Sequence, residues 1–300
     1  MLAERLPQGR MMKMRFTKME GCGNDYVYVD CVREHPELAQ ADEETLKQLA
    51  IAVSDRHFGI GSDGLILILP SDVADFRMKM FNSDGSESEM CGNGTRCIGK
   101  FVYDKGLTAK NPVRLETLAG IKVLDLHLKN GQVDTVTVDM GEPVLEPAQI
   151  PVLCAKNPVI GMEMRAVDRE FIATCVSMGN PHAVVFLEEP VADFDLNRYG
   201  KAAEVSSLFP KKANIEFINV LGPRELRMRV WERGAGETLA CGTGACATVV
   251  AAILNGICRR EDEVTVHLLG GDLSIRWDKD TGHVFMTGPA RFCFDGVWLK

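Results

Sequence analysis

The sequence predicts an α/β fold of the α+β type, in which two duplicated domains each form a curved, mainly antiparallel sheet wrapped around a central helix. Three observations support this expectation. The two halves of the chain repeat each other, each half is rich in segments of alternating polarity, and each half contains one strong helix signal after a Cys-Gly-x-Gly turn. The length of 300 residues also fits two domains, since a single core seldom grows beyond ~250–300 residues.

The repeat aligns residue 76 with 226 and residue 91 with 241, an offset of 150 positions. Residues 76–107 match residues 226–257 without a gap, and the match places Cys91-Gly-Asn-Gly against Cys241-Gly-Thr-Gly. One copy in each half indicates a duplicated domain, because solenoid proteins repeat at shorter periods of about 20–50 residues.

The expected domain limits follow from this repeat and from a linker rich in Gly and Pro between residues 139 and 151. They are an extension at 1–13, an N-terminal half at 14–139 that a C-terminal strand at about 290–300 completes, and a C-terminal half at 140–289.

Alternating polarity predicts the strands. Apolar residues alternate with basic ones over residues 76–81, as in a strand with one buried face, and residues 226–231 repeat the pattern. Further strands are expected near 26–29, 65–69, 121–126, 136–140, 183–187, 215–220, 273–277 and 283–286.

Helical spacing of apolar residues predicts a helix at 46–53 and its counterpart at 196–203. The strongest helix of each half follows Cys-Gly-x-Gly. Residues 245–254 are almost wholly apolar, and Gly256 is a natural helix C-terminal residue. Because a helix that is apolar on all sides must be buried on all sides, we expect the sheet to surround it.

Composition argues against several classes of partner. The net charge is −8 with no basic stripe, which disfavours nucleic acid as a partner. No stretch approaches the ~20 apolar residues that cross a membrane, and the first residues do not resemble a secretory signal, so we expect a cytoplasmic location. The 10 cysteines lack regular spacing and any Cys-x-x-Cys, which argues against a disulfide scaffold and a metal site.

Two of the cysteines occupy special places, because Cys91 and Cys241 each precede a glycine-rich turn that opens a helix. Unpaired N–H groups and the positive end of the helix dipole stabilise a thiolate there. They can lower a cysteine pKa from about 8.5 to roughly 3.5–7.5. The same N–H groups form an anion site that suits a carboxylate. Each half thus offers a base beside a carboxylate site.

Two such halves that face each other could invert a carbon centre. The two turns would hold one carboxylate, and the sulfurs would flank its α-carbon from opposite sides. One thiolate would remove the α-proton while the other thiol delivers a proton to the opposite face. A lone cysteine usually just packs, but packing does not explain why both copies carry one at a helix start.

Four segments resemble those of the diaminopimelate epimerase family, and together they cover nearly everything after residue 13. They read KMEGCGND at 18–25, FNSDGSESEMCGNGTRC at 81–97, SMGNPH at 177–182 and WERGAGETLACGTG at 231–244. The resemblance implies two domains related by a pseudo-two-fold axis and a homodimer. It implies interconversion of LL- and meso-2,6-diaminopimelate for lysine and peptidoglycan precursor synthesis. It also implies no pyridoxal phosphate, no other cofactor and no metal.

The resemblance further implies a role for individual residues. Cys241 would accept the proton and Cys91 would donate one in one direction, with the roles exchanged in reverse. His182 and Glu232 would support or tune these thiols. We expect a buried Arg233 to form a bidentate pair with the distal carboxylate of the substrate. The expected substrate contacts are Asn24, Asn82, Gly92, Asn93, Asn180, Asn214, Glu232, Arg233, Gly242 and Thr243.

One departure from the family pattern concerns the site. Gly64 stands where some relatives carry Gln, so a side-chain contact to the substrate is absent at that position.

Two alternatives remain open. The nearest is another two-cysteine racemase of the same fold, of the proline or hydroxyproline type, whose first motif resembles Cys-Gly-His-Gly where this chain has Asn93. The other is a non-catalytic redox sensor, in which Cys91 and Cys241 switch between dithiol and disulfide.

Overall fold

The computed structural model describes residues 13–299, so the predicted extension lies outside the described residues apart from Lys13. The first half contains β1 (Lys13–Gly21), β2 (Asn24–Asp30), the 3-10 helix η1 (Pro36–Gln40), α1 (Glu43–Ser54), β3 (Gly64–Leu69), β4 (Phe76–Asn82), β5 (Glu87–Ser88), α2 (Gly92–Asp104), β6 (Val113–Thr117), β7 (Gly120–Lys129) and β8 (Gln132–Asp139).

The second half begins with one additional strand and then repeats this order, and a last strand returns to the first half. It contains β9 (Met162–Ala166), β10 (Arg169–Ser177), β11 (Pro181–Phe186), the 3-10 helix η2 (Val191–Asp193), α3 (Leu196–Glu204), β12 (Asn214–Gly222), β13 (Glu225–Glu232), β14 (Gly236–Glu237), α4 (Gly242–Leu254), β15 (Val264–Leu268), β16 (Gly271–Trp277), β17 (Val284–Pro289) and finally β18 (Arg291–Leu299).

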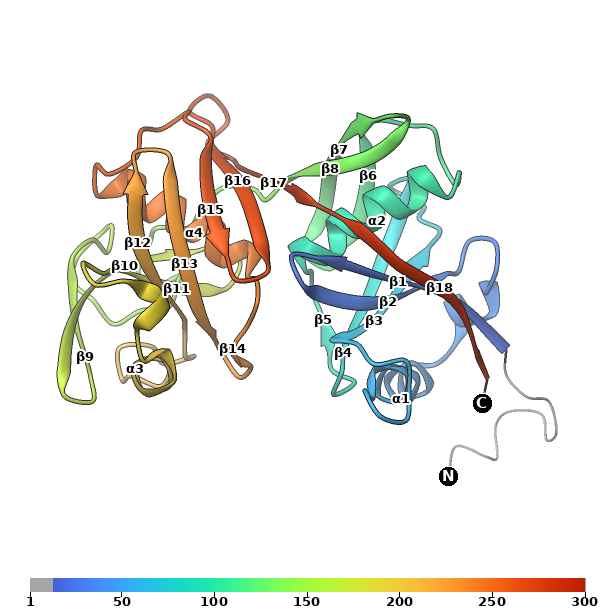
Figure 1. Ribbon diagram of the computed structural model, residues 1–300, viewed down its shortest axis with the longest axis horizontal. Helices are drawn as coiled ribbons and strands as arrows, with labels where there is room; N and C mark the ends of the chain where they lie inside the picture. The colour runs from blue at the N-terminus through green and yellow to red at the C-terminus, as the bar shows by residue number, and fades with distance from the viewer. Residues whose placement is uncertain (1–12, 300) are drawn as a thin grey trace.

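The strand pairing confirms the predicted duplication. Parallel pairs occur at corresponding places in the two halves: β2 with β3 and β11 with β12, then β4 with β6 and β13 with β15. The other strand pairs of the described residues are antiparallel, so the sheet is mainly antiparallel, as predicted. The halves lie side by side, with the first half in blue to green and the second in yellow to orange (Figure 1).

Two strands tie the halves together. β17 pairs with β8 from Phe285–Asp139 to Pro289–Thr135. β18 then crosses to the first half, where it pairs with β1 from Lys13–Leu299 to Glu20–Arg291 (Figure 1). We therefore propose that residues 14–139 together with about 290–300 form one domain, and that residues 140–289 form the other.

The central helices α2 and α4 lie within the main hydrophobic core, which contains side chains from both. The first 11 residues of α2 and nearly all of α4 up to Ala252 are buried, which confirms the prediction of a sheet wrapped around each helix. A smaller core lies between α1 and the sheet of the first half, and a matching one lies between α3 and the second.

The strand β3 is an unbroken apolar run, and the core covers both of its faces. Leu65, Leu67 and Leu69 pack in the α1 core, whereas Ile66 and Ile68 point the other way into the main core. Because successive side chains point to opposite faces, both faces of β3 must be covered, and they are.

The packing of β3 leads to the first prediction. Leu67 has no exposed surface, and Leu67→Ala should lower the free energy of unfolding by ~2–5 kcal/mol, because the truncation leaves a cavity under α1. The control is Val73→Ala at a residue that is 56% exposed, which should change stability by no more than ~0.5 kcal/mol. Urea unfolding measures both, and equal losses would contradict the assignment of this core.

Candidate active site

Cys91 and Cys241 are the N-cap residues of α2 and α4, in extended backbone conformations with φ of −128° and −123°. In each turn the sulfur accepts a hydrogen bond from the backbone N–H three residues later. The distances are 3.5 Å from Gly94 N to Cys91 Sγ and 3.4 Å from Gly244 N to Cys241 Sγ. The two copies of the motif therefore have the same local geometry, and each sulfur caps the start of a buried helix.

Both cysteine turns open into one cleft, a cavity of about 510 Å³. An adjoining cavity of about 910 Å³ shares part of its wall and adds Asn214. The residues singled out in the sequence that line the first cavity are Asn24, Asn82, Cys91, Gly92, Asn93, Asn180, Glu232, Arg233, Cys241, Gly242 and Thr243. The fold thus brings together side chains that lie far apart along the chain.

Asn24 has a fixed orientation, because its Nδ2 donates to Asp63 Oδ2 at 2.8 Å. Its Oδ1 therefore faces the cleft, where it accepts from Cys91 Sγ and from Asn93 Nδ2, both at 3.3 Å. Asp63 is held in turn by Arg56 at 2.9 Å. Sequence reasoning missed Asp63, although it precedes Gly64 in a segment that the family resemblance had already marked.

His182 does not line the cavity around the cysteines, because it is fully buried behind Asn180. Its Nε2 lies 2.9 Å from Asn180 Oδ1, and its Nδ1 lies 2.6 Å from Glu216 Oε1. Glu216 is also fully buried, and its Oε2 has no hydrogen-bond partner among the described residues. No sequence signal pointed to Glu216, because it stands in the apolar run that forms β12.

Glu232 stands at the end of β13, where it faces the cleft beside Cys241. Burial raises the pKa of Glu232, and hydrogen bonds from the Thr238 hydroxyl and the Cys241 thiol only partly offset this effect. A carboxylate with these neighbours is suited to hold or pass on a proton.

The prediction that Arg233 is buried is wrong. Arg233 follows the last residue of β13 and is exposed at the cleft, because the chain turns outward at Gly234, whose φ is +80°. Its guanidinium donates to Lys211 O at 3.1 Å, while its main-chain N–H donates to Asn214 Oδ1 at 2.8 Å. The backbone of Arg233 is therefore fixed, and its side chain borders the cleft.

The expectation of a low thiol pKa is also wrong for both site cysteines. Burial raises the pKa of Cys91, and the N–H groups of its turn only partly offset this. Burial raises the pKa of Cys241 well above its ordinary value, and the carboxylates of Glu232 and Glu216 add to the effect. The helix N-terminus acts in the predicted direction, but the loss of solvation is the larger effect.

Gly64 begins β3 beside this cleft, and the backbone leaves no room for a side chain there. An added Cβ would lie 2.1 Å from Phe81 O and 2.8 Å from Tyr26 Cε1. Any larger residue therefore requires β3 to shift against β4.

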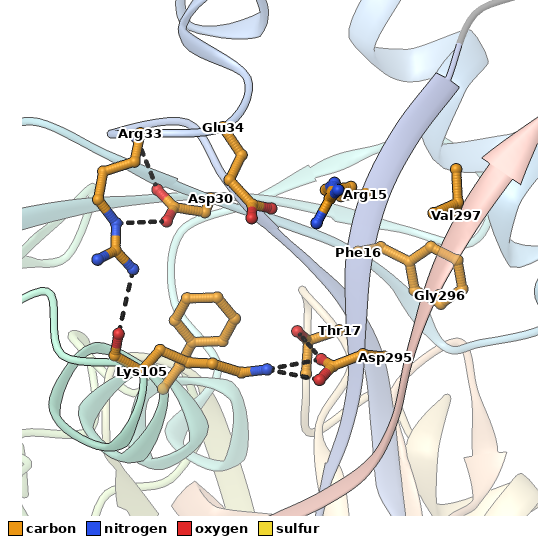
Figure 2. A pocket seen from close by; sticks show the side chains of 11 residues that line it. Arg15, Phe16, Thr17, Asp30, Arg33, Glu34, Lys105, Asp295, Gly296 and Val297 are labelled. Carbon is orange, nitrogen blue, oxygen red and sulfur yellow. Dashed lines mark hydrogen bonds and ion pairs between the residues drawn. The ribbon is translucent and has the colours of Figure 1, made fainter.

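A separate cavity of about 330 Å³ lies over β1 and β18 and contains neither site cysteine. Its charged groups largely pair with one another (Figure 2): Arg33 Nε lies 3.2 Å from Asp30 Oδ2, and Lys105 Nζ lies 2.7 Å from Asp295 Oδ2. Within residues 13–299, no group of three or more His, Cys, Asp and Glu residues could hold a metal ion. No helix of that range is long and apolar enough to cross a membrane.

The chain matches the family model for diaminopimelate epimerase over residues 16–146 and 174–293. It is 56% identical over 283 residues to a diaminopimelate epimerase of Methanococcus maripaludis, which covers 94% of this chain and 99% of that protein. It is also 56% identical over 284 residues to a diaminopimelate epimerase of Acetivibrio thermocellus, with 94% and 98% covered.

Among solved structures, the chain resembles a hydroxyproline epimerase from Agrobacterium vitis with bound trans-4-hydroxy-L-proline. The TM-score is 0.67 at 14% identity, and the match covers 96% of this chain and 92% of that one. At 14% identity, this likeness shows a shared fold and nothing about the substrate.

The close contact at Gly64 leads to a second prediction. Gly64→Ala should lower the free energy of unfolding by ~1–3 kcal/mol, because the new methyl group must displace backbone. The matched control is Gly222→Ala, also in a strand, where the nearest atom to an added Cβ is Glu225 Cβ at 4.0 Å. Chemical unfolding should show little change for the control. A similar loss in both variants would mean that the loss reflects strand glycines in general.

Proposed function

The chain belongs to the diaminopimelate epimerase family, and on that premise we propose that it interconverts LL- and meso-2,6-diaminopimelate by proton exchange at Cys91 and Cys241. It is thus an isomerase whose product serves lysine and peptidoglycan precursor synthesis. One observation carries the two-cysteine mechanism: both sulfurs line one cleft, each at the N-terminus of a buried central helix. The two thiols supply the acid and the base, so the proposed reaction needs no cofactor.

The substrate α-carboxylate binds between the two helix starts. Gly92 and Asn93 of one turn and Gly242 and Thr243 of the other line the cleft, and helix N-termini present N–H groups that suit an anion. The same groups stabilise the reaction, because removal of the α-proton spreads negative charge onto that carboxylate. Stabilisation of charge that develops in the transition state is a large term in catalysis.

The proton transfers follow from the two sulfurs. In one direction the Cys241 thiolate takes the α-proton, and the Cys91 thiol donates its proton to the opposite face of the carbanion. The configuration at the α-carbon inverts, and the two sulfurs have exchanged protonation states. In the reverse direction the roles are exchanged, so each cysteine acts as acid and as base.

Substrate binding adds a positive charge inside the cleft, next to the sulfurs. Burial disfavours both thiolates, and the α-ammonium group of an amino acid would favour them. Asn24 Oδ1 and the Glu232 carboxylate face the cleft as acceptors for this group. His182 supports the site from behind, because it contacts Asn180. The base therefore forms chiefly when the substrate is present.

The distal amino-acid head of diaminopimelate has its own contacts. Arg233 borders both cavities, and its guanidinium can pair with a carboxylate in bidentate fashion once it leaves Lys211 O. Asn82, Asn180 and Asn214 line the same space and offer amide donors and acceptors. These contacts favour diaminopimelate over proline, which has no second carboxylate.

We also propose that the chain forms homodimers in the cytoplasm. Phe292, Phe294 and Val297 of β18 are 37%, 50% and 52% exposed. Apolar side chains exposed along a strand that, in the described part of the chain, pairs with a neighbour on one side alone favour contact with another chain. All ten cysteines are free thiols, which fits a reducing compartment.

The mechanism predicts that Cys91→Ala and Cys241→Ala each lower the rate of epimerisation by roughly 10²–10⁴-fold or more, because each removes the proton carrier of one face. Turnover of LL-diaminopimelate and deuterium uptake from solvent measure the loss. The matched control is Cys97→Ala, a fully buried cysteine of α2, which should change turnover little. Near wild-type turnover in either site variant would refute the two-base mechanism. A reversible disulfide without any turnover would favour a redox sensor.

The distal contact predicts a change in specificity. Arg233→Met should lower kcat/KM for diaminopimelate by about 10–100-fold, because a charged hydrogen bond contributes ~1.5–3 kcal/mol. Lysine lacks the distal carboxylate, so its residual turnover should change far less, and proline should be inert. The control is Arg198→Met, whose guanidinium pairs with Asp168 outside the cleft. Equal losses for lysine and diaminopimelate, or good turnover of proline, would overturn distal recognition by Arg233.

A further inference from the structure

Arg96 is the largest fully buried side chain of the described residues, and none of its hydrogen-bond acceptors is a carboxylate. A buried cation is unfavourable unless an opposite charge or good hydrogen bonds compensate it. Its Nε donates to Pro289 O at 3.1 Å. Its Nη2 donates to Asn93 Oδ1 at 3.1 Å and to Cys22 Sγ at 3.7 Å. Its Nη1 donates to Gly92 O at 3.5 Å and to Met286 Sδ at 3.7 Å.

These contacts place the guanidinium against the cysteine turn of the first half. Arg96 donates to Asn93 Oδ1, which leaves Asn93 Nδ2 to donate to Asn24 Oδ1. The same oxygen of Asn24 accepts from the Cys91 thiol. Arg96 thus determines how the Asn93 amide is oriented beside the reacting sulfur, and it does so from a position outside the cleft.

The second half has no equivalent cation. The repeat places Cys246 opposite Arg96, and Cys246 is a buried thiol. Two carboxylates, Glu216 and Glu232, act on Cys241 instead. The duplication therefore gives the two cysteine turns the same backbone, but a cation acts on the first and carboxylates dominate at the second.

We propose that Arg96 is a positioning residue that orients Asn93 in the first cysteine turn and makes Cys91 ionise before Cys241. Its effect on catalysis rests on the proposed epimerase function. The order of ionisation is a property of the protein without substrate, and it can be measured independently.

The groups around Cys91 act in both directions. Burial raises its pKa, the N–H groups of its turn and the Arg96 guanidinium lower it, and Glu232 raises it. Asn24 Oδ1 accepts from the thiol and so favours the protonated form. Burial raises the pKa of Tyr26 well above its ordinary value, so its hydroxyl keeps a proton that it can donate to the sulfur.

The groups around Cys241 favour the thiol more strongly. Glu232 and Glu216 both raise the pKa of Cys241, on top of burial, while Thr243 and the N–H of its turn lower it. The only ring contact to these carboxylates among the described residues is that of His182, whose Nδ1 lies 2.6 Å from Glu216 Oε1. Arg96 therefore has no counterpart that acts directly on Cys241.

The order has a consequence for catalysis. If Cys91 ionises first, the enzyme holds a base on one face of the substrate and an acid on the other before the reaction begins. The isomer whose α-hydrogen faces Cys91 meets that base directly, whereas the other isomer requires the proton to move from Cys241 to Cys91 first.

The test measures alkylation of the full-length protein by iodoacetamide as a function of pH, with the rate at each cysteine read by mass spectrometry. The pH midpoint, not the rate, reports ionisation, because Cys91 and Cys241 differ in exposure. The exposed Cys293 serves as the internal reference for the reagent. We expect a lower midpoint for Cys91 than for Cys241, and the reverse order would overturn the proposal.

Variants then assign the effect to Arg96. Arg96→Met should raise the Cys91 midpoint, so that its alkylation near neutral pH falls about tenfold or more, and should leave the Cys241 midpoint in place. Glu216→Gln is the complementary variant and should lower the Cys241 midpoint alone. An unchanged Cys91 midpoint in Arg96→Met, or a shift at Cys22 instead, would show that Arg96 does not act on Cys91.

Arg96→Lys keeps the charge but not the forked geometry, so it should keep the Cys91 midpoint close to wild type while raising KM through the loosened Asn93. If Arg96→Met does not fold, Arg96→Lys still tests the role of charge. A folded Arg96→Lys variant with a strongly raised Cys91 midpoint would show that the positive charge does not favour the Cys91 thiolate. In the epimerase assay, the acid limb of kcat/KM should move to higher pH in Arg96→Met. Absence of turnover in the wild type would refute the proposed function and leave the alkylation result standing.

Discussion

At the first turn of a buried helix, the backbone N–H groups have no carbonyl of the same helix to accept their hydrogen bonds, and this constraint organises the molecule. Both α2 and α4 lie within the main core, yet each begins at the cleft, with a cysteine sulfur as its N-cap. The sheets that bury the two helices therefore also bring their electropositive ends to one place. A site for a carboxylate between two sulfurs is a direct result of how the helices are buried.

Burial and the helix N-terminus compete at these sulfurs, and burial is the larger effect. The thiols of Cys91 and Cys241 both have raised pKa values, although backbone N–H groups favour their ionised forms. A second cation inside the cleft would favour both thiolates further. An amino-acid substrate brings that cation with its carboxylate, which links formation of the base to binding of the right class of molecule.

Duplication made the backbone of the two halves alike and left their charges different. The parallel strand pairs and central helices correspond, but Arg96 faces the first turn while Glu216 and His182 lie behind the second. A reaction that removes a proton from one face of a carbon and adds another at the opposite face needs one acid and one base at any moment. Unequal surroundings for two equal cysteines provide that difference.

The sequence by itself determined the duplication, the central helices, most strands and the two cysteine turns, because each leaves a local pattern of polarity or spacing. Only the tertiary structure decided what depends on distant partners. β1 escaped prediction because Lys18 is buried in it, where it pairs with Asp25 at 2.5 Å. Likewise, the contact between His182 and Glu216, the exposure of Arg233 and the raised thiol pKa values depend on burial and on neighbours from other strands, which periodicity along the chain does not record.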